Sequence, residues 1–400
     1  MQDNEKKPAL RFKGFTDPWE QRKLGDITVE LSEYATQELG LPLLTSSRSG
    51  LMYQDEYRDS RTTKSTETLF SVVPVGTCTY RHMSDDDVFH MNINTLEKGL
   101  VSREYPVFEA SKGNNLEFLV QHINSSEEFK AFCAEQKKGG TRTRLYYNTL
   151  CQFTVRVPAL KEQAQISQCL KKLDTLITLH QRKHEKLVNI KKSMLDKMFP
   201  QNGVSVPEIR FKGFTDPWEQ RKFSELYEKV SRKNDLTYGK DDIISVANMY
   251  YKAESYITDE NYLLTYNVFE MGDIAFEGNK SKNFAHGRFV ENTIGNGIVS
   301  HVFDVFKPRM TNYDLQFWKY AINNERIMGP ILLRSTKAST MMTNLVADDF
   351  LQENFLIPCY EEQKKIGEFL NQLDTLITLH QRKLEKLQNI KKSCLEKMFV

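Results

Sequence analysis

The amino-acid sequence predicts a multi-domain α+β protein, in which two α/β-type modules are joined by two long antiparallel helices of coiled-coil character. Three observations lead to this prediction. A short box occurs twice, a long helical stretch occurs twice, and the segments between them differ. The chain of 400 residues is therefore interpreted as two half-length units in tandem, related by a pseudo-two-fold axis.

The box is the most strongly repeated segment of the chain. Arg11–Lys23 reads RFKGFTDPWEQRK, and Arg210–Lys222 repeats the same thirteen residues. Over the longer ranges 8–23 and 207–222, 14 of 16 positions are identical. This repeat indicates a duplication of the whole half rather than a chance similarity.

The helical stretches, residues 158–199 and 358–399, are identical at 28 of 42 positions. A proline stands at the start of each, where it is tolerated, and apolar residues then recur at spacings of three and four. This pattern predicts two helices with a coiled-coil-like seam. If a two-fold axis relates the halves, the helices pack antiparallel. His180 and His380 fall on the seam and are expected to be partly buried there rather than to bind a metal. The apolar seam positions are Ile166, Leu170, Leu173, Ile177, Leu187, Met194 and Met198, and in the second copy Ile366, Leu370, Leu373, Ile377, Leu384, Leu387, Cys394 and Met398.

The intervening segments, 24–157 and 223–357, show no convincing identity with each other. Each is interpreted as a compact α/β-type domain of about 130 residues. Local patterns predict strands over residues 70–75, 152–157 and 298–306, and helices over 126–135 and 315–324. Two modules of different specificity on one repeated scaffold would produce this contrast between matched and diverged segments.

The domain boundaries follow from the repeat. We predict two modules that include their boxes and two helical segments that follow them. The predicted domains are residues 1–157, 158–203, 204–357 and 358–400.

The net charge of +2 hides an uneven distribution along the chain. Each intervening segment carries 14 basic and 18 acidic residues, a net charge of −4, whereas the helical stretches carry +5 and +2. If the modules bind DNA, their basic side chains must therefore gather on one face.

Two stretches of the modules combine basic side chains with hydroxyls, the groups that contact phosphates and base edges. Both lie shortly before a helical stretch, at matching places in the repeat. A second, weaker pair of stretches lies earlier in each module. The candidate DNA-contact residues are Lys137, Lys138, Arg142, Thr143 and Arg144 with Arg334, Ser335, Thr336 and Lys337 from the first pair, and Arg81, Lys280 and Lys282 from the second.

Several function classes lack their sequence signatures. No run of about 18 apolar residues and no secretory signal occurs, and the six cysteines form no C-x-x-C pair, so a soluble protein of the reducing cytoplasm is expected. No phosphate loop, nucleophile elbow or H-E-x-x-H motif is present, so we expect no catalytic residues in this chain. His82, Asp85–Asp87 and His90 offer metal-ligand chemistry, but an acidic surface loop is the simpler interpretation, and no metal site is expected.

The order of box, variable module and long helix, repeated once, resembles the specificity subunit of type I restriction-modification enzymes, the HsdS family. The resemblance is carried by the two RFKGFTDPWEQRK boxes, by the P-x-x-x-E-Q-x-x-I helix starts at Pro158–Ile166 and Pro358–Ile366, and by the two LDTLITLHQRK helices. It covers the whole chain in layout.

This resemblance implies that the modules are target recognition domains, each of which reads one half of a bipartite site in double-stranded DNA. It also implies that the helices form a spacer, which sets the gap between the half-sites and docks two methyltransferase subunits. S-adenosylmethionine would then belong to those subunits, and ATP and Mg²⁺ would belong to restriction (motor-nuclease) subunits that join them. This chain itself would have no cofactor and no catalytic role.

Two alternatives of other classes remain. A stand-alone coiled-coil DNA-binding or scaffold protein would share the helices and the modules without any methyltransferase partner. A stand-alone DNA methyltransferase or nuclease is disfavoured by the missing motifs.

Overall fold

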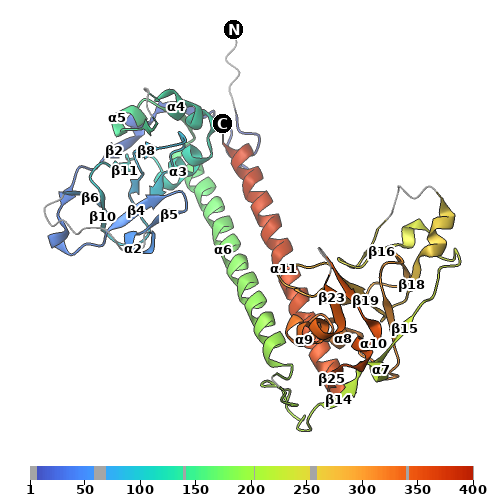
Figure 1. The fold of residues 1–400 in the computed structure, drawn as a ribbon. Coiled ribbons are helices and arrows are strands. Elements are labelled where there is room, and N and C mark those ends of the chain that lie inside the picture. The colour runs from blue at the N-terminus through green and yellow to red at the C-terminus, as the bar shows by residue number, and fades with distance from the viewer. Residues whose placement is uncertain are drawn as a thin grey trace. The chain divides into compact units, whose positions relative to one another are not determined.

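Both predicted helices are present in the computed structural model, which describes residues 7–57, 69–137, 141–201, 203–252, 259–338 and 342–399. Helix α6 spans Leu160–Lys197 and helix α11 spans Tyr360–Met398 (Figure 1). No helix in these described ranges is both long enough and apolar enough to cross a membrane.

The chain divides into two compact units, and this division cuts both long helices. Unit 1 contains residues 1–180 and 383–400, so it holds the first module, the start of α6 and the end of α11. Unit 2 contains residues 181–382, with the end of α6, the second module and the start of α11. Each unit is therefore built from both halves of the sequence repeat.

The module of unit 1 is a set of short antiparallel strands with small helices, consistent with the predicted α+β class. Its strands join in the orders β1-β13, β2-β11-β7-β9, β10-β6-β3, β12-β8 and β4-β5. The elements are β1 (Glu20–Lys23), α1 (Leu24–Ile27), β2 (Thr28–Glu30), β3 (Tyr34–Ala35), β4 (Leu44–Ser47), β5 (Gly50–Tyr53), α2 (Gln54–Tyr57), β6 (Phe70–Val73), β7 (Cys78–Thr79), β8 (Met83–Ser84), β9 (Asn92–Ile93), β10 (Gly99–Ser102), β11 (Val107–Ala110), α3 (Leu116–Ser125), α4 (Glu127–Glu135), β12 (Thr143–Arg144), α5 (Tyr147–Leu150) and β13 (Thr154–Val157).

The module of unit 2 repeats this order with antiparallel strands paired as β14-β25, β15-β22-β19-β20, β16-β17, β18-β21 and β23-β24. Its elements are β14 (Glu219–Lys222), α7 (Phe223–Leu226), β15 (Tyr227–Val230), β16 (Ile244–Ser245), β17 (Tyr250–Tyr251), β18 (Asn267–Phe269), β19 (Ile274–Glu277), β20 (Arg288–Glu291), β21 (Gly297–Val299), β22 (Val305–Pro308), α8 (Leu315–Ala321), α9 (Glu325–Ser335), β23 (Thr336–Ala338), β24 (Thr343–Leu345), α10 (Ala347–Gln352) and β25 (Asn354–Ile357).

The two diverged modules share details that their sequences hide. The buried amide of Asn94 donates to the carbonyls of Val73 and Glu97, and Asn292 donates to Phe269 and Gly295 in the same way. A polar side chain also caps the corresponding helices: Asn115 accepts from the Phe118 amide before α3, and Asp314 accepts from Phe317 before α8. One fold therefore underlies both modules, although their surfaces differ.

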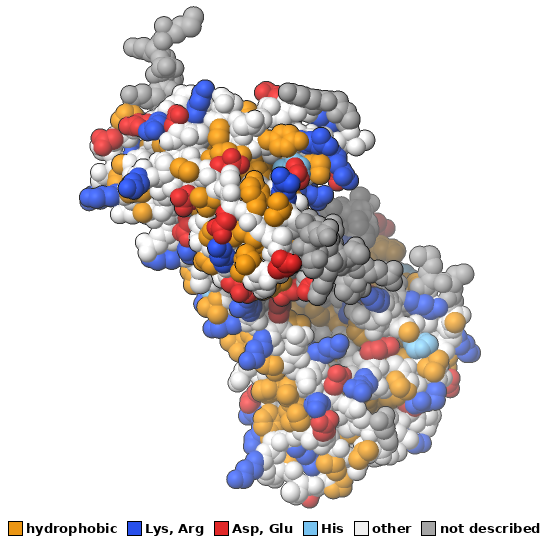
Figure 2. All heavy atoms as spheres, turned by 90° about the vertical axis from the view of Figure 1, so that its left-hand side faces the viewer, with side chains coloured by type: hydrophobic (Ala, Val, Ile, Leu, Met, Phe, Trp, Pro, Cys, Tyr) orange, Lys and Arg blue, Asp and Glu red, His pale blue; other side chains and the backbone are white. Residues whose placement is uncertain are grey.

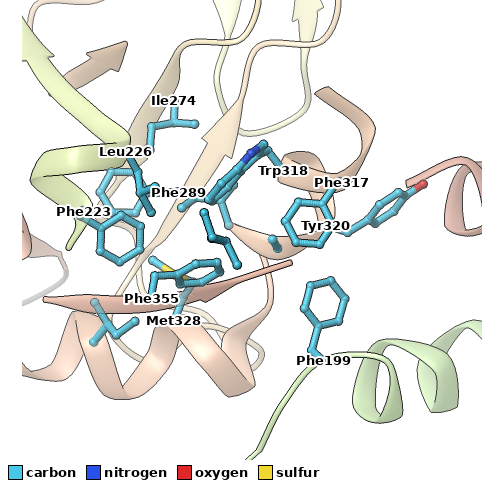
Figure 3. Packing of buried hydrophobic residues seen from close by; sticks show 14 of the residues in the cluster. Phe199, Phe223, Leu226, Ile274, Phe289, Phe317, Trp318, Tyr320, Met328 and Phe355 are labelled. Carbon is cyan, nitrogen blue, oxygen red and sulfur yellow. The ribbon is translucent and has the colours of Figure 1, made fainter. Parts of the chain in front are cut away.

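The core of unit 2 is aromatic and includes the end of α6. Phe199, at 1% exposure, stacks on Phe317 (Figure 3). Phe199 also meets the ring of Trp218 edge-on. Residues of the module complete this cluster, among them Phe223, Phe289, Trp318 and Phe355.

The core of unit 1 uses the end of the other helix in the same way. Met398 is buried in it, and Phe399 stacks on His122 with ring centroids 4.8 Å apart. The end of α11 thus completes the core of the first module, which lies more than 240 residues earlier in the chain.

The helices run antiparallel within each unit, as the sequence predicts. In unit 2, Lys191 of α6 pairs with Asp374 of α11 at 2.6 Å, and in unit 1, Lys391 pairs with Asp174 at 2.5 Å. These are equivalent positions of the repeat. His180 and His380 are half-buried, which confirms their predicted place on the seam.

Most of the local predictions within the modules are confirmed, with one correction. The helix predicted over 126–135 is α4, and the strand predicted over 152–157 contains β13. The single strand predicted over 298–306 is wrong, because the chain turns between β21 and β22. A backbone hydrogen bond from the Phe303 amide to the Ser300 carbonyl closes that turn, and hydrophobic alternation alone did not reveal it.

Candidate nucleic-acid interface

In unit 1, two basic stretches that are far apart in the sequence lie next to each other and form one surface. Strands β8 and β12 pair antiparallel, with Arg144 opposite Met83. The Leu145 amide also donates to the His82 carbonyl at 2.8 Å. This pairing places Arg81 beside the segment that carries Arg142 and Arg144, and all three side chains belong to exposed residues.

Unit 2 brings its two candidate stretches together at the matching place. The Thr343 amide of β24 donates to the Gly278 carbonyl at 2.8 Å, and Asn279 forms an isolated bridge with Met342. Since β24 pairs with β23, the exposed Lys280 and Lys282 follow a segment that borders the hairpin carrying Lys337. Equivalent elements therefore carry the candidate cations in both units.

Three of the hydroxyl groups predicted to contact DNA form hydrogen bonds within the protein. Ser335, which is fully buried, donates to the Ile331 carbonyl at 2.9 Å, and Thr336 donates to Leu332 at 2.6 Å. Thr143 is likewise buried and bonds to Asp87. These hydroxyls hold the ends of the basic stretches in place, and the exposed cations beside them supply the surface chemistry.

Carboxylates accompany several of the candidate cations. Arg142 Nε lies 2.7 Å from Asp85 Oδ1, and Lys137 Nζ lies 3.6 Å from Asp87 Oδ2. In unit 2, Arg334 holds Glu353 through two hydrogen bonds of 2.8 and 2.6 Å. Because an exposed ion pair such as Arg142–Asp85 contributes little to stability, about 0–1 kcal/mol, the Arg142 guanidinium can exchange its carboxylate for a phosphate or a base at small cost.

Lys138 lies outside the residues that the structure describes. The other predicted residues are described, and of these Thr143 and Ser335 are buried rather than exposed.

One basic residue on the same surface was missed from the sequence. Arg48 lies at the tip of the β4–β5 hairpin and pairs with Asp86. The hydrogen bond from Arg48 lowers the pKa of the Asp86 carboxyl, so the acid is ionised at neutral pH. The sequence Ser46–Gly50, a serine-rich turn with one arginine, could have indicated a DNA contact. It lies far along the chain from the other candidate residues.

The acidic stretch Asp85–Asp87 binds the basic side chains of its own module. Each of its three carboxylates contacts Arg142, Arg48 or Lys137. Among the residues that the structure describes, no group of three or more His, Cys, Asp or Glu side chains is arranged to hold a metal ion.

The basic side chains of the described residues do not form one uniform patch on the face drawn in Figure 2. On the face drawn in Figure 2, Lys and Arg side chains are interspersed with Asp and Glu side chains. Binding to DNA would therefore depend on local groups of cations, such as those beside β8–β12 and β23–β24, rather than on the net charge of +2.

Comparison with known proteins gives consistent matches. The sequence model of the type I restriction modification DNA specificity domain matches residues 90–189 and 215–389, more than half of the chain. The specificity subunit of type I restriction enzyme MjaVIII from Methanocaldococcus jannaschii is 24% identical over 291 residues, a match that spans 66% of this chain and 65% of that protein.

Comparison with solved structures also gives matches, and the first of the two that follow supports the fold. The S subunit of a type I restriction-modification system from M. genitalium matches with a TM-score of 0.58 at 12% identity, over 99% of both chains. The HsdS subunit from Thermoanaerobacter tengcongensis matches with a TM-score of 0.44 at 14% identity, over 95% of this chain and 96% of that one.

Proposed function

The chain belongs to the family that carries the type I restriction-modification DNA specificity domain, and from this premise we propose that it is the sequence-specificity subunit of a type I restriction-modification complex. In this role it binds a bipartite site in double-stranded DNA, and each module reads one half-site. It carries out no catalysis itself.

One observation carries the proposal: the two units share a fold, a box and a scaffold, but differ on the surface that bears their cations. Unit 1 presents Arg81, Arg142 and Arg144 beside β8–β12, and unit 2 presents Lys280 and Lys337 beside β23–β24. Phosphate contacts from such side chains position a protein, and base contacts specify the sequence. Different side chains at equivalent places would read different half-sites.

The long helices supply the second part of the proposed role. They set the gap between the half-sites and offer a docking surface for two methyltransferase subunits. Four leucines at equivalent positions of the repeat stay 42–46% exposed: Leu176, Leu179, Leu376 and Leu379. Exposed apolar side chains at equivalent positions of two helices are consistent with two copies of one partner, each of which binds to one of the two sites.

The chemistry would reside in the partners. S-adenosylmethionine would bind to the methyltransferase subunits, and ATP and Mg²⁺ to restriction subunits that join the complex. The complex would act in the cytoplasm, where it meets the chromosome.

A map of N6-methyladenine across the host genome tests this proposal. The host expresses the methyltransferase partner either with or without this chain. We expect a split motif with a constant gap, present only with the chain. Exchange of residues 24–157 for the module of another protein should then change one half of the motif and leave the other half unchanged.

Two results would contradict the proposal. Absence of chain-dependent methylation, with an active partner present, would favour a stand-alone coiled-coil DNA-binding or scaffold protein. Methyl transfer by the purified chain alone would instead indicate an enzyme. A change in both halves of the motif after the module exchange would overturn the assignment of one half-site to each module.

A further inference from the structure

A tight hairpin in unit 1 presents an arginine next to the proposed DNA surface. Strands β4 and β5 pair up to Ser47, so Arg48 and Ser49 form the turn. The buried amide of Asn92 donates to Ser46 Oγ at 2.7 Å and to the Ser47 carbonyl at 2.8 Å. These bonds tie the hairpin tip to β9, so Arg48 stands on a fixed support.

The hairpin tip shares a surface hollow with a residue that the sequence predicted as a DNA contact. Its turn residues, Arg81 and the loop from Ser84 to His90 line a cavity of about 390 Å³ within unit 1. Arg48 therefore lies on the same side of the module as Arg81 and the β8–β12 pair.

Two arginine–aspartate pairs lie next to each other on this surface. Arg48 binds Asp86, and Arg142 binds the adjacent Asp85. The side chains are 66% and 50% exposed in the first pair and 53% and 68% exposed in the second. Pairs this exposed contribute little to folding stability, so stability does not account for the position of Arg48.

The shape of the support indicates what Arg48 can reach. The major groove of DNA admits a two-stranded β-ribbon, and β4–β5 is such a ribbon with Arg48 at its tip. An arginine fork donates two hydrogen bonds to O6 and N7 of guanine, the commonest specific contact between a side chain and a base. Asp86 accepts one hydrogen bond from the Arg48 guanidinium, and a better acceptor can replace this carboxylate.

We propose that the β4–β5 hairpin enters the major groove of the half-site read by unit 1 and that Arg48 reads a guanine there. This inference rests on the proposed function and adds a specificity-determining residue to it. It requires at least one G·C pair in that half-site. Asp86 is the resting counter-ion of Arg48 and reduces its attraction to DNA of any other sequence.

The test measures binding of DNA by the complete chain in complex with its methyltransferase partner. One duplex carries the bipartite site obtained from the methylation map, and a second duplex of equal length carries a scrambled sequence. Further duplexes replace each G·C pair of the site by A·T in turn. Arg48→Ala should weaken binding of the true site by about 5- to 150-fold, with a much smaller effect on the scrambled duplex. For one G·C position, the variant should no longer distinguish G·C from A·T.

Three further variants separate base reading from simple charge. Arg48→Lys keeps the charge but loses the fork, so it should bind the scrambled duplex normally and lose discrimination at the same position. Asp86→Asn releases Arg48, so this variant should bind the scrambled duplex more tightly. The slope of its affinity against salt concentration should become steeper, by up to the amount that about one additional phosphate contact contributes. Arg103→Ala removes an exposed arginine of the same module, which lies over the Tyr34 ring, and should leave discrimination intact.

The outcomes distinguish the two levels of the proposal. If the wild-type complex fails to distinguish the true site from the scrambled duplex, the proposed function itself is wrong. If it does distinguish them but Arg48→Ala weakens both duplexes equally, Arg48 contacts only phosphate and the guanine assignment is overturned. A mapped motif without any G·C pair in the half-site of unit 1 would also overturn it.

Discussion

Arg11 in the first box holds Glu162 at the start of α6 through two hydrogen bonds, Nε–Oε1 at 2.8 Å and Nη2–Oε2 at 2.6 Å. Glu162 is only 1% exposed. Arg210 and Glu362 repeat this contact in unit 2, with both distances at 2.8 Å. The box and the helix start are thus repeated together because they form one buried ion pair.

Arg11→Ala should destabilise unit 1 by about 3–5 kcal/mol, because it leaves the Glu162 carboxylate buried without its partner. Urea unfolding followed by circular dichroism measures this change. The double variant Arg11→Met with Glu162→Leu should recover most of the loss, since neither charge remains buried. Glu20→Ala breaks the exposed pair with Arg22 and should cost less than about 1 kcal/mol. An equal loss in Arg11→Ala and Glu20→Ala would contradict this account.

The spacing of the interhelical ion pairs allows a sharper test of the spacer. Asp174 and Lys191 are 17 residues apart in α6, and so are Asp374 and Lys391 in α11. Consider four residues inserted into α6 between Asp174 and Lys191, and four more inserted into α11 between Asp374 and Lys391. Both ion pairs, Lys191–Asp374 and Lys391–Asp174, would be preserved, and each helix would become about 6 Å longer.

We expect the double insertion to change the gap in the methylated motif while both half-sites stay the same. An insertion in α6 alone, between Leu173 and Ile190, should break the matched pairing and impair assembly. The methylation map measures both effects. An unchanged gap in an active double-insertion complex would remove the spacer role from the helices.

Glu291 provides a test of pH dependence in unit 2. Burial raises the pKa of its carboxyl well above the usual range, although the Tyr313 hydroxyl, which bonds to it, acts in the opposite direction. The native state therefore keeps a proton that the unfolded chain releases near pH 4.3. Because the native state binds more protons, the free energy of unfolding falls as pH rises above that value, by up to about 1.4 kcal/mol per pH unit.

Glu291→Gln has no proton to lose, so its free energy of unfolding should fall less steeply with rising pH than that of the wild type. The comparison covers roughly three pH units, from about pH 5 to about pH 8. The slope of the unfolding free energy against pH is the measured quantity. Glu228→Gln, at an exposed position of β15, serves as the control and should keep the wild-type slope. Identical slopes in Glu291→Gln and wild type would show that Glu291 does not titrate differently in the two states.

Four of the remaining candidate cations can be tested one at a time in the assembled complex. Alanine at Arg142, Arg144, Arg334 or Lys337 should weaken binding of the true site by about 1–3 kcal/mol where the residue reads a base. A phosphate contact should instead weaken all sequences alike and reduce the salt slope by about one. Lys307→Ala, at an exposed position of β22, is the control. Wild-type binding in all four variants would mean that other loops contact the DNA.

We could predict the repeat, both long helices and their antiparallel pairing, because each produces a local or periodic pattern in the sequence. The boxes and LDTLITLHQRK stretches are identical strings, and the 3-4 spacing of apolar residues reports the buried face of a helix directly. The candidate site was predicted in part, since Arg142 and Lys337 lie in compact basic stretches. The equivalence of individual residues in the two modules, such as Asn94 and Asn292, escaped prediction because they lie within otherwise different sequences.

By itself, the sequence determined that this protein is two copies of one scaffold carrying two different modules. Only the tertiary structure decided which parts belong together: Phe399 packs against the core of the first module, the segment of Arg81 borders that of Arg144, and the turn at Arg48 shares a surface hollow with Arg81. The physical reason is that periodicity reports which face of an element is buried, but not which distant element covers it. Contacts between strands and loops far apart in the chain arise from the packing of the whole unit, and they leave no signal at either residue alone.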